Sequence, residues 1–385
     1  MCLLPISQAA VIRGIKDQEL LSLIRSQIAD WKDFSHQAIA NEFRLKRDET
    51  TIKDIVSSFG YFDAVVKSSI DKCTVLFSVQ LNDRYKFNDI SLNYTDQKEY
   101  RSGLKVEQAF DLINIDYDSY TTTKQISDGK DKIRSFFKKK GFAFVNVSQP
   151  RVEIDKKNKK MKATYDVKLN GKVVIDHTIL NIKSKKDPKL IEPFIRNRIS
   201  WKDGDAYDSQ KISNMREDLM SSGIFAGIEV LLSDPIPDKD DAHLSHTTVT
   251  INIDEALLRD ISVGIKYGSS EKAGILFSWT HYNVDGKGAK LSTILDVTKN
   301  TKIVRIKYDI YDPFYKKQNL AIQGFCVKEN VSSYEVSKAG TESILWQTFG
   351  MKFKIGAGAC CEHAKTRDKI DGGRSKFTAF GVPIG

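Results

Sequence analysis

The sequence lacks the features that most often reveal a protein's chemistry. Its 385 residues include only five cysteines, no two of them spaced as Cys-x-x-Cys. Because no histidine cluster accompanies these cysteines, the usual zinc sites are excluded. Five is an odd number of cysteines and gives no disulfide framework. No run approaches the ~20 consecutive apolar residues that a membrane-spanning helix needs. Helical membrane proteins are therefore excluded, whereas membrane strands, which give a much weaker signal, remain possible. The five cysteines are Cys2, Cys73, Cys326, Cys360 and Cys361.

Catalytic motifs are also absent. The chain has no Walker loop, GxGxxG, HExxH or nucleophile elbow, and residues 286–288 (Gly-Lys-Gly) are better interpreted as a hairpin turn. His243 and His246 are expected in a polar loop without a third ligand, as surface histidines. Asp203 and Asp205 precede a predicted helix, where carboxylates favour the N-terminus. We therefore expect no enzyme activity, no cofactor and no metal.

Charge is unevenly distributed along the chain. The net charge of +10 would by itself suggest nucleic acid or an anionic surface as partner. Up to Leu258 there are 40 basic and 38 acidic residues, and after it 20 basic and 12 acidic ones. The lysine runs at residues 138–140, 156–160 and 183–186 lie among acidic segments, which is typical of solvated surface. The excess of basic over acidic residues therefore belongs mainly to the last third of the chain. We expect no nucleic-acid partner.

Length and composition predict several folded domains. The chain is well over twice the ~150 residues of one average domain. Hydrophobic residues make up 41% and charged residues 29%, which is enough apolar surface for cores. Residues 1–11 run from apolar to small side chains, so they are either a signal-peptide remnant or a disordered N-terminus, and both readings stay open.

Three segments of the chain repeat one pattern. Gly60, Gly141 and Gly223 are separated by 81 and 82 residues, and each follows a helical pattern and precedes an apolar residue. Each glycine fits a helix C-terminal cap, where a left-handed backbone costs little without a β-carbon. The residues eight and four positions before each glycine share one helix face: Ile52 and Val56, Ile133 and Phe137, Met215 and Leu219.

Strand patterns complete each repeat. The first helices are predicted at residues 18–29, 106–113 and 188–199, and strands follow the glycines at 64–67, 143–152 and 225–232. A second alternating strand follows in each repeat, as in Tyr165, Val167 and Leu169. The unit is therefore β-α-α-β-β, and an unrelated α+β repeat would give the same order.

This repeat resembles the polypeptide-transport-associated (POTRA) domain. The resemblance rests on the glycine and following apolar residue before the hairpin, and on the run Val-Gln-Leu-Asn-Asp-Arg-Tyr-Lys-Phe-Asn-Asp-Ile at residues 79–90. It implies POTRA domains at residues 12–83, 84–170 and 171–257.

After Arg259 the helical pattern gives way to alternating strands. Such a dyad pattern is what a barrel with a lipid-facing exterior and a polar lumen requires, although a soluble sandwich would alternate as well. The apolar stripe of the first strand is Ile261, Val263, Ile265 and Tyr267. Later stripes are Ile275, Phe277 and Trp279; Val304, Ile306, Tyr308 and Ile310; Phe349, Met351, Phe353 and Ile355.

The order of the parts resembles the outer-membrane protein assembly superfamily, and the count of three repeats resembles its TamA branch rather than its five-repeat BamA branch. The first four barrel strands of that branch are similar to residues 264–267, Trp279, Asn283, Gly286, Gly288 and residues 311–313 (Tyr-Asp-Pro). The fold class implied is α+β tandem POTRA repeats followed by an antiparallel transmembrane β-barrel segment at residues 258–385.

The resemblance implies a location and a mechanism. The barrel would lie in the bacterial outer membrane, in contact with its lipid, and the POTRA domains in the periplasm. Unfolded outer-membrane proteins would add to POTRA sheet edges. They would then be templated at the barrel's first strand, whose face Ile261, Val263, Ile265 and Tyr267 would form the seam. A TamB-like partner anchored in the inner membrane is a further expectation.

Two alternatives to that function stay open. One is a two-partner-secretion-type transporter of a single client, which usually has two POTRA repeats, so that the third counts against it. The other is a remnant that binds periplasmic partners without inserting.

One departure from the superfamily concerns length. A sixteen-stranded barrel needs on the order of 300 residues at ~10 residues per strand plus turns. Residues 259–385 allow six to eight strands, and the Arg-Gly-Phe/Tyr motif and terminal aromatic strand signal of the superfamily are missing. We therefore expect an incomplete barrel from a truncated or split gene product.

Overall fold

The computed structural model describes residues 10–28, 38–71, 74–96, 106–184, 188–241, 243–269, 272–349 and 353–385. Most of the expected N-terminal segment, together with Cys2, Cys73 and Met351, lies outside the described residues. The chain divides into two compact units. One contains residues 1–172 and 242–244, and the other residues 173–241 and 245–385.

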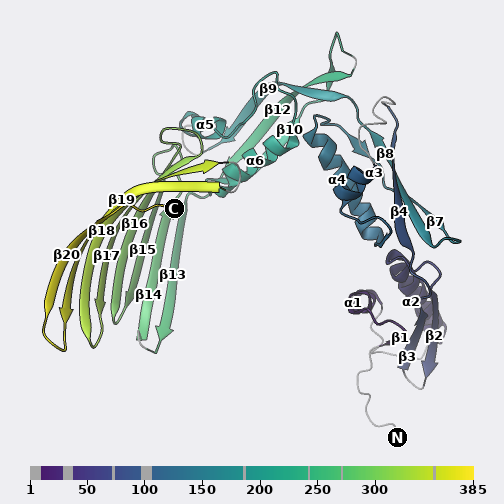
Figure 1. Ribbon diagram of the computed structural model, residues 1–385, viewed down its shortest axis with the longest axis horizontal. Coiled ribbons are helices and arrows are strands. Elements are labelled where there is room, and N and C mark those ends of the chain that lie inside the picture. The colour runs from purple at the N-terminus through teal and green to yellow at the C-terminus, as the bar shows by residue number, and fades with distance from the viewer. Residues whose placement is uncertain are drawn as a thin grey trace, which may run out of the picture. The chain divides into compact units, whose positions relative to one another are not determined.

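The first repeat packs two helices on a three-stranded sheet (Figure 1). β1 pairs parallel with β3, and β2 pairs antiparallel with β3 on its other side. Ile52 and Val56, which the repeat pattern placed on one helix face, are both fully buried against Leu20 and Phe77. The elements are β1 (Val11–Arg13), α1 (Gln18–Gln27), α2 (Ala38–Ser58), β2 (Val65–Asp71) and β3 (Thr74–Gln80).

The second repeat has the same order with a larger core. Ile133 and Phe137 of the second helix lie against Tyr165 and Val167 of the last strand, and the Tyr165 hydroxyl donates to the Ile126 carbonyl at 2.6 Å. β8 lies centrally in the sheet and pairs with β4, β6 and β7. The elements are β4 (Lys86–Tyr94), α3 (Val106–Ile113), β5 (Ser119–Tyr120), α4 (Thr123–Lys139), β6 (Asn146–Val147), β7 (Arg151–Asp155) and β8 (Lys160–Lys168).

The single strand expected at residues 143–152 is wrong. It is two short strands, β6 and β7, which pair with different parts of β8. Pro150 lies between them and has no backbone N–H to give to a ladder. At the same place the Ser148 hydroxyl accepts the Asp166 N–H at 3.2 Å, so a side chain interrupts the strand pairing.

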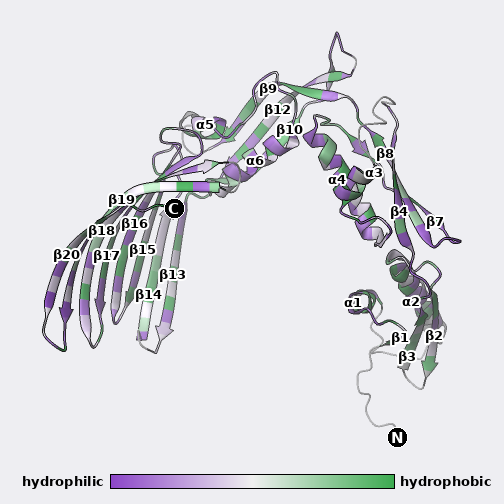
Figure 2. Ribbon diagram, in the orientation of Figure 1, coloured by the Kyte–Doolittle hydropathy of each residue, from purple (hydrophilic) through white to green (hydrophobic). Residues whose placement is uncertain are grey.

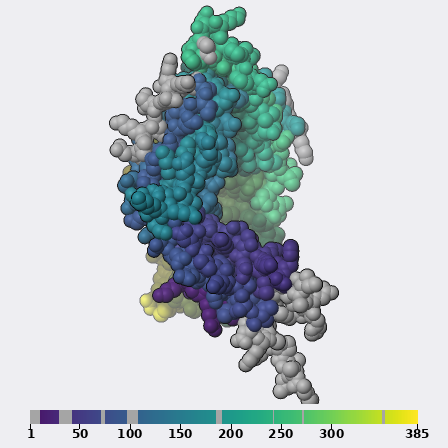
Figure 3. All heavy atoms as spheres, turned by 90° about the vertical axis from the view of Figure 1, so that its right-hand side faces the viewer, coloured from purple at the N-terminus to yellow at the C-terminus, as the bar shows by residue number. Residues whose placement is uncertain are grey.

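The first two repeats are joined by direct contacts. The Tyr85 N–H donates to the Gly60 carbonyl at 2.9 Å, and the Tyr85 hydroxyl donates to Asp63 Oδ2 at 2.6 Å. Lys159 Nζ donates to the same carboxylate oxygen at 2.7 Å. The hydrogen bond from Lys159, and after it the one from Tyr85, lowers the pKa of Asp63, so its carboxylate stays charged. In the space-filling view the two repeats, purple and blue, form one continuous surface (Figure 3).

The third repeat ends in a long antiparallel pair. β12 pairs with β10, β11 and β9. Helix α5 ends at Arg196 rather than at the expected residue 199. The Asn197 N–H still bonds to the Pro193 carbonyl four residues back, but the following N–H groups bond three residues back, from Arg198 to Ile195 and from Ile199 to Arg196. The elements are β9 (Lys172–Lys183), α5 (Pro188–Arg196), α6 (Ser209–Ser221), β10 (Phe225–Leu232), β11 (Ile236–Pro237) and β12 (Leu244–Glu255).

Eight antiparallel strands then form one sheet in sequence order, at the upper end of the expected range (Figure 1). The hairpin turn predicted at residues 286–288 lies in the connection from β14 to β15. There Asn283 Oδ1 accepts the Gly288 N–H at 2.8 Å. The strands are β13 (Arg259–Gly268), β14 (Lys272–His281), β15 (Lys290–Thr298), β16 (Thr301–Tyr311), β17 (Gln318–Asn330), β18 (Tyr334–Phe349), β19 (Phe353–Asp368) and β20 (Arg374–Gly381).

Candidate functional site

The predicted seam residues lie on the edge strand β13. Within the described part of the chain β13 pairs with β14 alone, so its other edge leaves backbone donors and acceptors free to pair. The four apolar side chains share one face of the strand, with exposed fractions of 63% for Ile261, 70% for Val263, 89% for Ile265 and 78% for Tyr267. The edge and the exposed stripe together suit the addition of another strand.

This stripe continues across the whole sheet because the register keeps directly opposed residues on one face. We call this surface the apolar face. One cross-strand row is Val263, Phe277, Leu295, Val304, Cys326, Ala339, His363 and Thr378. The next row is Ile261, Trp279, Thr293, Ile306, Gly324, Thr341, Cys361 and Phe380. Neither of these two rows contains Asp, Glu, Lys or Arg. A shallow hollow of about 500 Å³ lies on the apolar face and is lined by Val304, Ile306, Cys326 and Cys361.

The opposite face of the sheet carries charged side chains among apolar ones such as Leu276, Ile303 and Val327. Lys266 Nζ reaches Asp296 at 2.7 Å, and Gly274 lies between them on β14. A β-carbon at Gly274 would lie 3.2 Å from Lys266 Cε and 2.7 Å from Thr298 Cγ2, so glycine leaves the space that the lysine crosses. The alternation of hydrophilic and hydrophobic residues along these strands is visible in Figure 2. An apolar stripe on one face and ion pairs on the other are typical of strands in a membrane barrel.

The three repeat glycines all have the left-handed backbone. Their φ angles are +91° at Gly60, +100° at Gly141 and +73° at Gly223. Gly223 is also packed closely, since a β-carbon there would lie 2.8 Å from the Tyr282 ring. That ring follows β14, so the glycine of the third repeat also permits contact with the sheet.

A buried ion pair fixes the third repeat to the sheet. Arg198 Nη1 donates to Asp312 Oδ2 at 2.9 Å and to the Phe194 carbonyl at 2.8 Å, and the two charged side chains are only 14% and 8% exposed. The guanidinium also lies 3.5 Å from the centre of the Phe194 ring. Burial lowers the pKa of Arg198 and Asp312 opposes that shift. Gly288 approaches the same ring so closely that a β-carbon would lie 2.7 Å from Phe194 Cδ2.

Sequence reasoning missed this junction. In the sequence, Tyr311 and Asp312 belong to a barrel-like motif, and nothing in the pattern around Arg198 indicates a charged partner. The two charges are 114 positions apart. Only folding brings them together.

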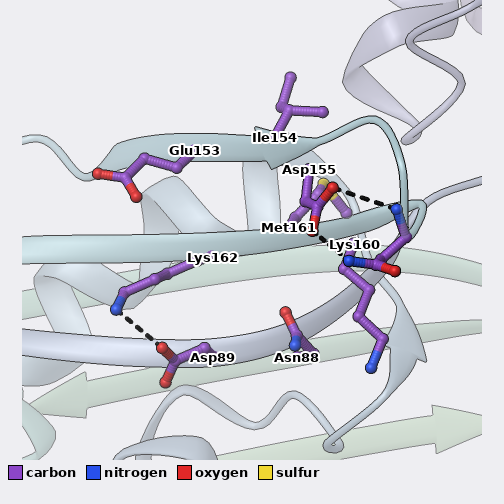
Figure 4. Close-up of a pocket in the computed structure, with 9 residues that line it drawn as sticks. Asn88, Asp89, Glu153, Ile154, Asp155, Lys160, Met161 and Lys162 are labelled. Atoms are coloured by element: carbon purple, nitrogen blue, oxygen red, sulfur yellow. Dashed lines mark hydrogen bonds and ion pairs between the residues drawn. The ribbon is translucent and has the colours of Figure 1, made fainter.

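A hollow of about 610 Å³ lies beside the edge strand β7 in the second repeat (Figure 4). Glu153, Ile154 and Asp155 of β7 border it, and Lys162 and Asp89 form an ion pair at 2.9 Å on its other side. Ile154 is exposed. An exposed strand edge beside such a hollow is suited to the addition of an extended peptide.

The expected loop around His243 and His246 is partly wrong. His246 lies in strand β12, where its two ring nitrogens contact Asp176 at 3.1 Å and Asp238 at 2.8 Å. The strand forms because every second residue after His246 is buried, namely Thr247, Val249 and Ile251. Among the described residues no three His, Cys, Asp or Glu side chains are grouped as metal ligands. No helix in the described ranges is both long and apolar enough to span a bilayer.

Comparison with known proteins agrees with this architecture. Residues 85–169 match the POTRA family model, described as a surface antigen variable number repeat. A structure of BamA from Haemophilus ducreyi lacking POTRA domains 1–3 superimposes with a TM-score of 0.53 at 13% identity, over 78% of this chain. The chain spans 59% of the length of that BamA structure.

Two further structures are similar at lower scores. BamA POTRA3–5 from Haemophilus influenzae gives a TM-score of 0.40 at 16% identity, covering 65% of this chain and 96% of its own. CdiB from Acinetobacter baumannii gives 0.41 at 10% identity, covering 96% of this chain and 68% of its own.

The predicted fold class is therefore confirmed as tandem POTRA α/β domains followed by an eight-stranded antiparallel sheet that resembles part of a barrel. The likeness to the BamA structure is one of fold, in which POTRA-like repeats precede part of a barrel sheet.

Proposed function

We propose that this chain acts in outer-membrane protein assembly or secretion, with its POTRA domains in the periplasm and its sheet in the outer membrane. The observation that carries the proposal is the edge strand β13, whose four apolar side chains are 63–89% exposed, in a chain that also has three α/β repeats. Lipid would cover these side chains, and an incoming client strand would pair with the free edge.

The repeats supply the first binding step. The strands β2, β7 and β10 lie at sheet edges in the described residues, and each has an exposed apolar residue: Val65, Ile154 and Leu231 respectively. Backbone hydrogen bonds along an edge depend little on sequence, which suits many unfolded clients. Such a role needs no bond-making chemistry, so we propose binding and insertion and no enzyme activity.

A proline in the seam strand tests this function. Ile265→Pro removes a ladder donor and should lower client insertion by about tenfold, since a lost hydrogen bond in an apolar setting costs about 1–3 kcal/mol. The measurement is protease protection of a radiolabelled, urea-unfolded barrel protein added to vesicles that contain the full chain.

The neighbouring variant Gly264→Pro is the second half of the test. Successive N–H groups on an edge strand point alternately to the partner strand and to the free edge, so the two prolines affect different ladders. Both variants are first compared with the parent by thermal unfolding. Client insertion that is unchanged by either proline would overturn the role of β13.

The branch within the superfamily is a second proposal. A TamA-like factor with a TamB-like partner handles several clients, as the resemblance implies, whereas a dedicated secretion transporter handles one. The same assay with two unrelated barrel clients separates them. Insertion of both supports the assembly factor, and strict selectivity supports the transporter.

A further inference from the structure

The apolar face ends in a row of positive charge. The cross-strand row next to the Val263 row begins with Ile265, Ile275 and Val297 on the first three strands. It then continues as Lys302, Lys328, Ser337, Lys365 and Lys376. One row further out lie Glu335, Arg367 and Arg374. We call Lys302, Lys328, Lys365, Arg367, Arg374 and Lys376 the basic cluster.

The basic cluster lies at the turn end of the sheet. Its residues flank the turns at 299–300, 331–333 and 369–373, at the opposite end from Arg259, where the chain enters β13 from the third repeat. All six side chains are exposed. From Val304 to Ile310 the apolar face extends about 20 Å at ~3.4 Å per residue, which approaches the ~25 Å apolar band of a membrane barrel. The cluster thus lies at the expected height of lipid headgroups.

Like charges in the cluster are opposed directly. Lys302 faces Lys328, Lys365 faces Lys376, and Arg367 faces Arg374 across neighbouring strands. Directly opposed like charges destabilise a sheet unless an anion lies between them.

Among the described residues, only one carboxylate on this face forms an ion pair with the basic cluster. Lys328 pairs with Glu335 at 3.0 Å. The side chains of Lys302, Lys365 and Lys376 form no hydrogen bond or ion pair with any described residue.

We propose that the basic cluster binds the phosphate groups of anionic membrane lipids, an inference that rests on the membrane location in the proposed function. Phosphate oxygens accept hydrogen bonds from both lysine and arginine. A headgroup between two opposed basic residues would relieve their repulsion while its acyl chains cover the adjacent apolar rows. The positive surplus after Leu258 would then serve lipid binding rather than nucleic acid.

The test compares two triple variants of the full chain. Lys302→Gln, Lys365→Gln and Lys376→Gln together remove three basic groups that have no described protein partner. The control combines Lys139→Gln, Lys156→Gln and Lys157→Gln, three exposed lysines of the second repeat with the same change in net charge. Partition of each protein is measured by flotation with vesicles of phosphatidylcholine alone and with added phosphatidylglycerol.

The parent should bind the anionic vesicles more tightly, and the cluster variant should lose on the order of a hundredfold at low salt, about fivefold per lysine. The control should keep the affinity of the parent. Equal losses in both variants, or equal binding of the parent to both vesicles, would overturn the lipid site and leave the membrane location intact.

Two further arms separate the remaining explanations. Inorganic phosphate is compared with chloride at the same ionic strength; selective displacement by phosphate would show a site for the free anion and overturn the lipid proposal. Failure of the parent to associate with either vesicle would contradict the proposed membrane location itself, and the lipid site with it.

Discussion

At the scale of single residues, two different kinds of contact hold the junction between the third repeat and the sheet. One is the buried Arg198–Asp312 pair, and the other is a set of glycines that let aromatic rings approach the backbone. The first is an electrostatic contact that needs both partners, because a buried charge without its partner destabilises the folded state. The second is steric, because an added methyl group has no room.

Arg198→Met should destabilise the chain by about 3 kcal/mol, because it leaves Asp312 buried without its partner. Arg196→Met is the matched control: its pair with Glu192 is half exposed and contributes about 0.5 kcal/mol or less. Urea unfolding in detergent, followed by the fluorescence of the buried Trp201, measures both. Adding Asp312→Leu to Arg198→Met should recover stability, and no recovery would contradict this account.

Gly223→Ala should cost more than Gly204→Ala, although both glycines have positive φ. The left-handed backbone costs about 1–2 kcal/mol for alanine at either position. A β-carbon at Gly223 would also lie 2.8 Å from the Tyr282 ring, whereas nothing lies within 4 Å at Gly204. The difference between the two midpoints of thermal unfolding isolates the steric contribution, and equal midpoints would rule it out.

At the scale of elements, the third repeat contains a pH-sensitive contact between strands. Hydrogen bonding to Asp238, and also to Asp176, raises the pKa of His246 above 6.5, although partial burial opposes this. The bond from His246 lowers the pKa of Asp238 to about 2, helped by the N–H groups of Asp240 and Asp241. The contact therefore stabilises the pairing of β11 with β12, because Ile236 of β11 lies opposite His246.

The stability from this contact should be greatest in mildly acidic solution. The His246 contribution is fully present below pH 6.5 and is lost as the pH rises through its higher folded value. The Asp238 contribution is present above pH 3.8 and is lost as the pH falls towards 2. Hydrogen exchange of the Ile236 amide, which is the N–H of β11 because Pro237 has none, should show protection that falls with rising pH between pH 5 and 9 after correction for intrinsic rates. His246→Gln should abolish that trend, and an unchanged profile would contradict it.

At the scale of the whole molecule, the two faces of the eight-stranded sheet should respond differently to charge. Val263→Arg places a cation on the apolar face and should weaken membrane insertion by about 2–4 kcal/mol. Ser262→Arg places the same charge on the adjacent residue of the opposite face, in one row with Ser278 and Arg305, and should be nearly neutral.

The measurement is the fraction of full-length protein that stays with bacterial membranes after an alkaline carbonate wash. Release of the parent protein by that wash would support the alternative of a remnant that does not insert. Equal retention of the two arginine variants would mean that the apolar face does not contact lipid.

The sequence by itself determined the three repeats, the change from helical to alternating periodicity after Arg259, and the stripe from Ile261 to Tyr267. These are local properties: a glycine cap follows its helix within one turn, and a half-buried strand alternates with period two. The same local reasoning failed at residues 143–152, where Pro150 and the Ser148 hydroxyl divide one apolar run into two strands.

Only the tertiary structure decided which distant residues meet. The Arg198–Asp312 pair, the Asp63–Lys159 contact between repeats and the six residues of the basic cluster join positions far apart in the sequence. A cross-strand row depends on register, and a shift of one residue would move every side chain to the other face. The lysines that the sequence showed only as a surplus of charge become a cluster because the register of eight strands aligns them.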